Sequence, residues 1–155
     1  MPPATDRTSE AERLRHSVNR LARMMRHQDD GDLGATATAA LATVRKRGPL
    51  TLGELASFEQ VSPPTMTKVV EKLESRGFVT RRIDPDDRRV ARVTVTTGGT
   101  RYLERTRARR TEWLAGRLGE LEPTQVASLA GAIELLEAII GEPDCRPEAA
   151  AQRQR

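Results

Sequence analysis

Basic and hydroxyl side chains cluster at two places in the middle of this sequence. The first cluster comprises Ser62, Pro63, Pro64, Thr65, Thr67, Lys68 and Lys72, and the second comprises Asp87, Arg88 and Arg89. Guanidinium, ammonium and hydroxyl groups are the side chains that contact phosphates and base edges in nucleic acids. The two clusters therefore indicate a surface for a polyanion.

No catalytic signature accompanies these clusters. The sequence lacks the G-x-G-x-x-G and P-loop patterns, the zinc-binding H-E-x-x-H and the G-x-S-x-G nucleophile elbow. His16 and His27 would lie about 16 Å apart on one helix, so they cannot share a metal within a chain. The acidic residues that follow His27 are interpreted as a solvated loop. We expect no enzyme activity, no metal site and no cofactor.

The composition limits the architecture and the location. A chain of 155 residues, with 37% hydrophobic and 3% aromatic residues, suits one compact domain with a small accessory layer and an aliphatic core. No apolar stretch approaches the roughly 20 residues of a membrane span, and the N-terminus is too polar for a signal peptide. The single cysteine, Cys145, cannot form an internal disulfide. We expect a cytoplasmic protein without a membrane segment.

The charge is modest in sum but uneven along the chain. Twenty-six basic residues against 22 acidic ones give a net charge of +4. Residues 62–92 are rich in basic side chains, whereas residues 118–145 contain acidic residues and no basic one. This asymmetry favours one face for a polyanion and a separate face for another purpose.

The first cluster opens a predicted helix. Ser62-Pro63 is a helix start signal, Gly77 is a stop signal, and Met66, Val70 and Leu73 recur on one face between them. Thr51 can cap a shorter helix that ends about four residues before the helix that starts at Ser62-Pro63. The pair predicts a helix-turn-helix, and Lys68 lies outside the apolar stripe of its second helix.

The second cluster lies at the tip of a predicted hairpin. Hydrophobic residues alternate with polar ones at 79–83 and again at 91–95, and the polar segment 84–89 contains an Asp-Pro turn signal. A helix-turn-helix followed by a hairpin is a winged helix. Its second helix fits the major groove of DNA, and an arginine-tipped wing suits the neighbouring minor groove.

Apolar residues near both ends of the chain repeat with alternating three- and four-residue spacing. Such heptad seams have few places to be buried in one small subunit, so they predict a homodimer built from the terminal helices. The alternative is that the two helices pack on each other within one chain. The predicted dimerisation residues are Leu14, Val18, Leu21, Val126, Leu129, Ile133, Leu136 and Ile140.

The run from Leu52 to Gly99, with its DPDDRR wing, following strand and Thr-Gly-Gly helix entry, resembles the winged helix of the MarR family of bacterial transcriptional regulators. The resemblance extends over about residues 14–140. It implies a dimer that binds a pseudo-palindromic operator in double-stranded DNA. It also implies a repressor that is released from DNA by a small aromatic or phenolic ligand. The ligand would bind between the dimerisation region and the winged helix.

The resemblance also assigns roles to particular residues. Lys68 occupies a position whose side chain often contacts a base or a phosphate in the family. Arg89 occupies the wing position whose guanidinium enters the minor groove. Asp87 occupies the position of a wing carboxylate that orients neighbouring arginines. One departure is Glu59-Gln60, where many such turns have an apolar residue and glycine. The expected ligand-binding residues are Arg20, Arg23, Met24, His27 and Trp113.

We therefore predict a mainly α fold with a small β-hairpin wing, a winged helix-turn-helix plus dimerisation helices from both termini. The expected segments are a disordered N-terminus (1–9), an N-terminal dimerisation helix (10–30), the DNA-binding domain (31–98), a long helix with the C-terminal dimerisation helix (99–140), and a disordered tail (141–155). Two alternatives are a winged helix that binds proteins, which would have a neutral or apolar second-helix face, and a regulator without a small-molecule ligand.

Overall fold

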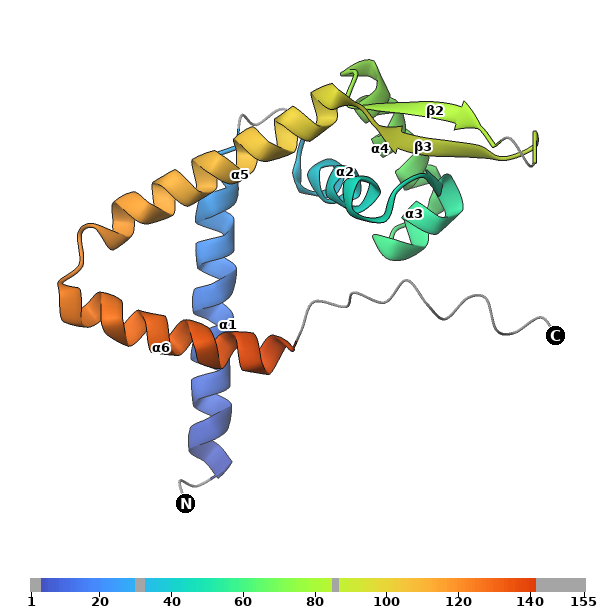
Figure 1. The fold of residues 1–155 in the computed structure, drawn as a ribbon. Coiled ribbons are helices and arrows are strands. Elements are labelled where there is room, and N and C mark those ends of the chain that lie inside the picture. Colours follow the sequence, from blue (N-terminus) through green and yellow to red (C-terminus); the bar gives the residue numbers. More distant parts are fainter. Residues whose placement is uncertain (1–3, 30–32, 85–86, 142–155) are drawn as a thin grey trace. The chain divides into compact units, whose positions relative to one another are not determined.

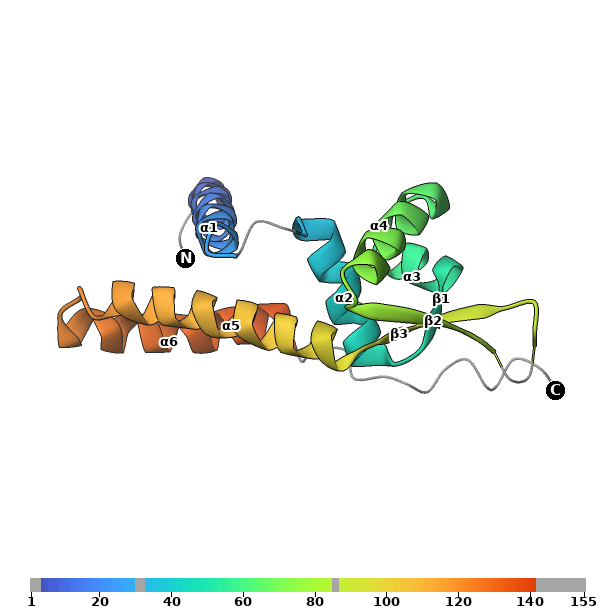
Figure 2. The same cartoon turned by 90° about the horizontal axis from the view of Figure 1, so that it is seen from above.

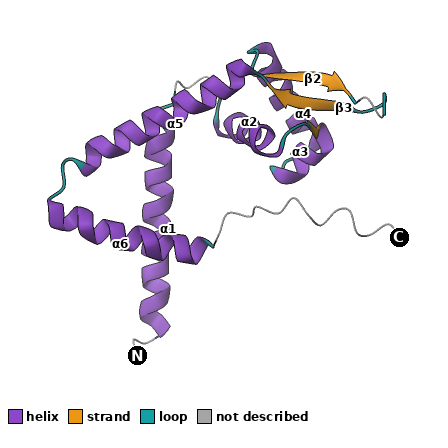
Figure 3. Cartoon of the chain, viewed as in Figure 1, coloured by secondary structure: helices purple, strands orange, loops and turns teal. Residues whose placement is uncertain are grey.

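The computed structural model describes residues 4–29, 33–84 and 87–141, and it is mainly helical with one small sheet (Figures 1 and 3). The winged-helix architecture predicted from the sequence is confirmed. The elements are α1 (Ala4–Arg26), α2 (Ala35–Arg47), β1 (Leu50–Thr51), α3 (Leu52–Phe58), α4 (Pro63–Ser75), β2 (Val79–Ile83), β3 (Ala91–Val95), α5 (Thr97–Leu118) and α6 (Pro123–Ile140).

Helices α2, α3 and α4 enclose the core, and the β2–β3 hairpin packs against them and projects beyond them (Figures 1 and 2). Three residues of the α4 stripe, Met66, Val70 and Leu73, are fully buried, together with Leu41 and Leu55 of the neighbouring helices. Burial of each such side chain contributes about 1.5 to 3 kcal/mol. The helix pair is thus held rigidly by its apolar face, which leaves the opposite face of α4 in solvent.

Both predicted cap residues begin their helices. The Thr51 hydroxyl accepts a hydrogen bond from the Glu54 amide at 3.2 Å, and the Glu54 carboxylate accepts one from the Thr51 amide at 2.8 Å, which is a capping box. Ser62 caps α4, and Pro63 and Pro64 occupy positions that need no backbone donor. These local signals fix where both helices of the motif start.

The sheet contains one strand more than the sequence predicted. β3 pairs antiparallel with β2 over five residues and, on its other edge, with the two-residue strand β1, giving the order β1-β3-β2. Leu50 lies opposite Val93, and both are buried. A two-residue strand is too short for an alternating pattern, so it was missed.

The hairpin is joined to α5 by a close approach of backbone. The Thr96 hydroxyl accepts from the Gly99 amide at 3.1 Å and donates to the Gly77 carbonyl at 2.6 Å. Gly99 is buried, and a Cβ placed there would lie 2.2 Å from the carbonyl oxygen of Phe78. The Thr-Gly-Gly run therefore contains a glycine because β2 and the start of α5 leave no room for a side chain.

Replacement of Gly99 by alanine should consequently destabilise the winged helix. The methyl group would force the backbone apart, and overpacking of this kind costs roughly 1 to 3 kcal/mol. Gly116→Ala is the matched control, because Gly116 is also in α5 but has open space around it, so helix propensity favours alanine by up to about 1 kcal/mol. Urea denaturation of both variants gives the comparison, and equal stability of the two would contradict this packing.

The borders of the outer elements differ from those predicted. α1 begins at Ala4 and no glycine or proline interrupts it, so residues 4–9, which the sequence predicts as part of the N-terminal segment, belong to this helix. Residues 1–3 and 142–155, with Cys145, lie outside the described residues. The chain forms two compact units, residues 1–114 and 115–155, and α5 runs without a break across the border predicted at residue 98.

Candidate nucleic-acid interface

The face of α4 opposite the core carries the side chains expected to meet DNA. Ser62, Pro63, Pro64, Thr65 and Lys68 are all exposed. The Ser62 and Thr65 hydroxyls lie 2.8 Å apart, and the Thr67 hydroxyl donates to the Pro63 carbonyl at 3.0 Å. Lys68 is thus the cation at the centre of this face, with hydroxyl groups around the helix start beside it.

Lys72, which the sequence predicts to contact DNA, has a hydrogen-bond partner within the protein. Its ammonium donates a hydrogen bond to the Leu33 carbonyl at 3.0 Å, just ahead of α2. Lys72 and Lys68 together line a cavity of about 310 Å3 between α4 and the start of α2. The ammonium of Lys72 therefore joins α4 to the segment before α2, a contact across 39 residues that the spacing within α4 could not indicate.

The turn of the helix-turn-helix forms without the glycine that many such turns contain. Gln60 has a φ of 53°, in the left-handed region where glycine is usual. The chain then returns to the core, because the Val61 amide donates to the Ala56 carbonyl at 3.1 Å. The Glu59 carboxylate accepts from the Thr43 hydroxyl at 2.6 Å, which anchors the turn to α2. The departure at Glu59-Gln60 therefore leaves the turn intact.

The described part of the wing tip is organised by Asp87. Its carboxylate accepts a hydrogen bond from the Arg89 amide at 3.0 Å, and its carbonyl accepts from the Val90 amide at 3.0 Å. The side chains of Arg88 and Arg89 are exposed, and neither forms an ion pair with a residue that the structure describes. Asp87 thus orders the turn, and both guanidinium groups remain available.

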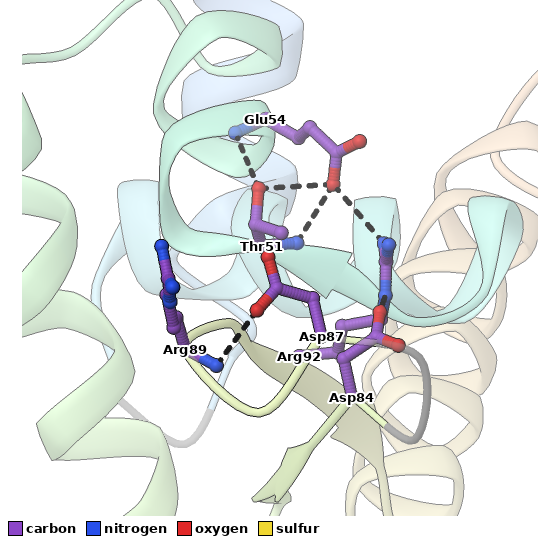
Figure 4. A network of polar contacts seen from close by, with 6 residues as sticks. All are labelled: Thr51, Glu54, Asp84, Asp87, Arg89 and Arg92. Atoms are coloured by element: carbon purple, nitrogen blue, oxygen red, sulfur yellow. Dashed lines mark hydrogen bonds and ion pairs between the residues drawn. The ribbon is translucent and has the colours of Figure 1, made fainter.

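The base of the wing is linked to α3 by a polar network (Figure 4). Arg92 on β3 forms an ion pair with Asp84, which is buried, and its guanidinium lies 3.6 Å from the Glu54 carboxylate. The hydrogen bond from the Thr51 amide, assisted by the Thr51 hydroxyl and the charge of Arg92, lowers the pKa of Glu54 from its ordinary value. The network therefore favours the ionised form of Glu54.

Two further cavities are lined by residues that lie between positions 23 and 114. The larger, of about 550 Å3, has an apolar wall that includes Met25, Ala42, Leu103 and Leu114. Its cationic lining residues are Arg45, Lys46, Arg107 and Arg110. The smaller, of about 280 Å3, is lined by Arg23, His27 and Asp29 among others.

The expected ligand-binding residues do not converge on one site. Arg23 and His27 line the smaller of these two cavities, whereas Arg20 and Met24 are exposed and Trp113 is half-buried outside both linings. The larger cavity was missed because α2 and α5, which are far apart in the sequence, supply most of its wall. Among the described residues no cluster of three or more metal-ligating side chains occurs.

One ion pair connects the two cavities. Arg110, which lines the larger one, donates to the Asp29 carboxylate at 2.8 Å through Nε and again through a terminal nitrogen. The hydrogen bond to Asp29 raises the pKa of Arg110 from its ordinary value, and both side chains are largely buried. Asp29 is thereby the partner of an arginine on α5.

The comparisons with known proteins agree with this architecture. The sequence profile described as the MarR family matches residues 33–91. The HTH-type transcriptional regulator MT0903.1 of Mycobacterium tuberculosis is 35% identical over 127 residues, which cover 81% of this chain and 89% of that protein. A crystal structure of a transcriptional regulator from Pseudomonas aeruginosa PA01 matches this chain with a TM-score of 0.77 and 28% sequence identity. The match covers 92% of this chain and 100% of that one.

A more distant structure includes nucleic acid. A MepR variant from S. aureus, solved bound to an oligodeoxyribonucleotide, has a TM-score of 0.68 and 16% identity, covers 85% of this chain and 98% of that one, and shares the fold. The winged helix and these matches define a DNA-binding transcriptional regulator, a class whose role is not enzymatic. The chain belongs to the MarR family. The family assignment predicted from the DPDDRR wing and the Thr-Gly-Gly entry is confirmed.

Proposed function

We propose that this regulator is a homodimeric repressor that binds a pseudo-palindromic operator through Lys68 on α4 and Arg89 on the wing. The observation that carries the proposal is that Lys68 on the exposed face of α4 and Arg89 at the wing tip form no ion pair with any residue that the structure describes. A protein-binding winged helix would instead favour a neutral or apolar α4 face. The family supports a cytoplasmic location.

The terminal helices support the dimer. Leu14, Val18 and Leu21 on α1 are exposed at 40% to 46%, and α6 has no buried residue. Val126, Leu129, Ile133 and Ile140 are exposed and Leu136 is half-buried. An apolar surface of this extent is expected to be covered by a partner.

By length and composition alone, α6 is long and apolar enough to cross a membrane, with a mean hydropathy of 1.2 over its 18 residues. Two observations favour a helical partner over lipid. The apolar residues follow a three-four repeat, and Glu134 and Glu137 interrupt the apolar sequence, where a carboxylate inside a bilayer would be costly. We therefore assign the apolar seam of α6 to the dimer.

Lys68 and Arg89 should make separable contributions to DNA binding. Lys68→Ala should lose a major-groove contact to a base edge or a phosphate. Arg89→Ala should lose a minor-groove contact that depends on groove width, costing about 1 to 3 kcal/mol and relaxing a preference for A·T-rich flanks. Binding of each variant to A·T-flanked and G·C-flanked operators at several salt concentrations measures both effects.

The fold should survive both substitutions, since both side chains are exposed, and thermal melting is the control. If Arg89→Ala binds both flanks as the wild type does, with the same salt slope, then the wing does not contact DNA in this protein. An exposed pair between Arg89 and a neighbouring aspartate would be worth at most about 1 kcal/mol and would not depend on the flanks.

The larger cavity is the site that we propose for a small aromatic ligand. Its wall is apolar on one side, and Lys46 and Arg107 offer cations with no ion pair among the described residues. This combination favours an aromatic carboxylate, with the ring against Leu103 and the carboxylate at the basic residues. Such an anion would compete with Asp29 for Arg110 and so loosen the link between α5 and the segment that precedes α2.

We expect benzoate, used as the probe, to weaken DNA binding of the wild type. Arg107→Gln should raise the dissociation constant for benzoate about tenfold, the effect of losing one hydrogen bond to a charged group. Arg105→Gln, which removes an exposed charge from α5 outside the cavity lining, should leave benzoate binding unchanged. Calorimetric titration tests this, and equal effects of the two substitutions would contradict the assigned site.

A further inference from the structure

One guanidinium connects the two parts of the domain that we propose to contact DNA. Arg92 is paired in register with Thr51 of β1 on one side and with Arg82 of β2 on the other. Its Nε donates to Asp84, the first residue after β2 and the base of the wing. Its Nη1 lies 3.6 Å from Glu54 Oε2 in the first turn of α3. Figure 4 shows Arg92 lying between these two carboxylates.

The Glu54 carboxylate and the backbone of Asp84 are each held by further hydrogen bonds. Glu54 Oε2 also accepts from the Thr51 amide at 2.8 Å and from the Thr51 hydroxyl at 3.0 Å. The Asp84 amide donates to the Val90 carbonyl at 2.8 Å, which closes the wing at its base. A guanidinium presents its donors in a rigid planar fork. Because the guanidinium of Arg92 contacts Asp84 on the wing and Glu54 on α3, it fixes the direction of the wing relative to α3. Helix α3 in turn packs directly on α4.

We infer that Arg92 is a positioning residue that sets the angle between the wing and the recognition helix α4, so that Arg89 and Lys68 can reach the two grooves of the duplex together. Arg92 acts through the wing and does not itself contact DNA. The inference rests on the proposed roles of Lys68 and Arg89. Preorganisation of this kind increases affinity because the bound geometry already exists in the free protein.

Glu54→Gln is the most informative substitution. The glutamine side chain can still accept from Thr51, so the cap of α3 remains, and Arg92 keeps its buried partner Asp84, but the charge that ties Arg92 to α3 is lost. We expect Glu54→Gln to reduce the preference for A·T-flanked over G·C-flanked operators roughly fivefold, without a change in the core consensus. Arg92→Gln should do the same and also lower the melting temperature, because the buried Asp84 carboxylate loses its ion pair with Arg92.

Arg82→Gln is the matched control for charge. Arg82 lies directly opposite Arg92 on β2, is exposed and has no ion pair among the described residues. Its loss should weaken binding to both flanks equally, through the general attraction of a cation to DNA. A purely structural effect of Glu54→Gln would also weaken both flanks equally and would lower the melting temperature.

A double-mutant cycle tests whether Glu54 and Arg92 act through Arg89. Fluorescence anisotropy gives the affinity of the full-length wild type, Glu54→Gln, Arg89→Ala and the double variant for both operators. We expect Glu54→Gln to change the flank preference by less than about twofold once Arg89 is absent. An additive effect in the double variant, or wild-type preference in Glu54→Gln, overturns the inference while leaving the proposed function intact. A wild type without flank preference overturns the inference together with the proposed role of Arg89.

Discussion

Ile133→Asp is expected to convert the protein into a monomer and to abolish tight operator binding in the same step. Ile133 is central in the apolar seam of α6 and is exposed at 45% in the single chain. A carboxylate there would face the partner seam, where burying an unpaired charge is prohibitive. Each half-site alone binds weakly, so loss of the second subunit should reduce affinity by at least about a hundredfold. Analytical ultracentrifugation and anisotropy on the same sample measure both effects.

Leu135→Asp is the matched control for this experiment. Leu135 lies two residues further along α6, is exposed at 68%, and falls outside the three-four repeat. The same charge at that position should leave the dimer and the affinity unchanged. If Ile133→Asp remains dimeric, or if the wild type sediments as a monomer while binding DNA tightly, then the terminal helices do not form the interface.

Insertion of five base pairs between the two half-sites of the operator should reduce the affinity of the protein for that operator about as strongly as Ile133→Asp does. Two recognition helices related by two-fold symmetry must enter successive major grooves on one side of the duplex, with centres about 10 bp apart. Five additional base pairs turn one half-site to the opposite side. The dimer can then contact only one half-site at a time, which again removes about a hundredfold or more of the affinity.

The control places the same five base pairs outside the half-sites, where length and composition change equally but the spacing does not. Anisotropy titrations with the three duplexes give the comparison. Unchanged affinity for the operator with the central insertion would contradict a rigid symmetric dimer on one face of the DNA.

The elements with local signals could be predicted from the sequence. Thr51 and Ser62 cap their helices through contacts only three residues away, and Gly77 ends α4 with a φ of 70°. The heptad repeat of α6 and the alternation in β2 and β3 are likewise properties of short segments. Because each of these features depends on neighbours in the chain, the residue pattern was sufficient to predict the winged helix and the family.

The features that join distant segments could not be predicted in this way. Arg110 and Asp29 are 81 residues apart, and Lys72 and Leu33 are 39 apart, so nothing in either segment alone indicates its partner. For the same reason the sequence did not indicate the larger cavity, formed from α2, α5 and the end of α1, and pointed to four residues of the first helix together with Trp113. Candidate DNA-contacting residues can be recognised within short segments of the sequence, whereas a ligand site depends on the tertiary packing of distant segments.

The central claim is that a symmetric dimer recognises a specific sequence in double-stranded DNA through α4 and the wing. The most direct measurement is selection of bound sequences from a random duplex library by the full-length protein, followed by sequencing. We expect a two-fold symmetric consensus with half-site centres about 10 bp apart and A·T-rich flanks where the wings lie. Recovery of no enriched sequence, or of a single half-site without symmetry, would contradict it.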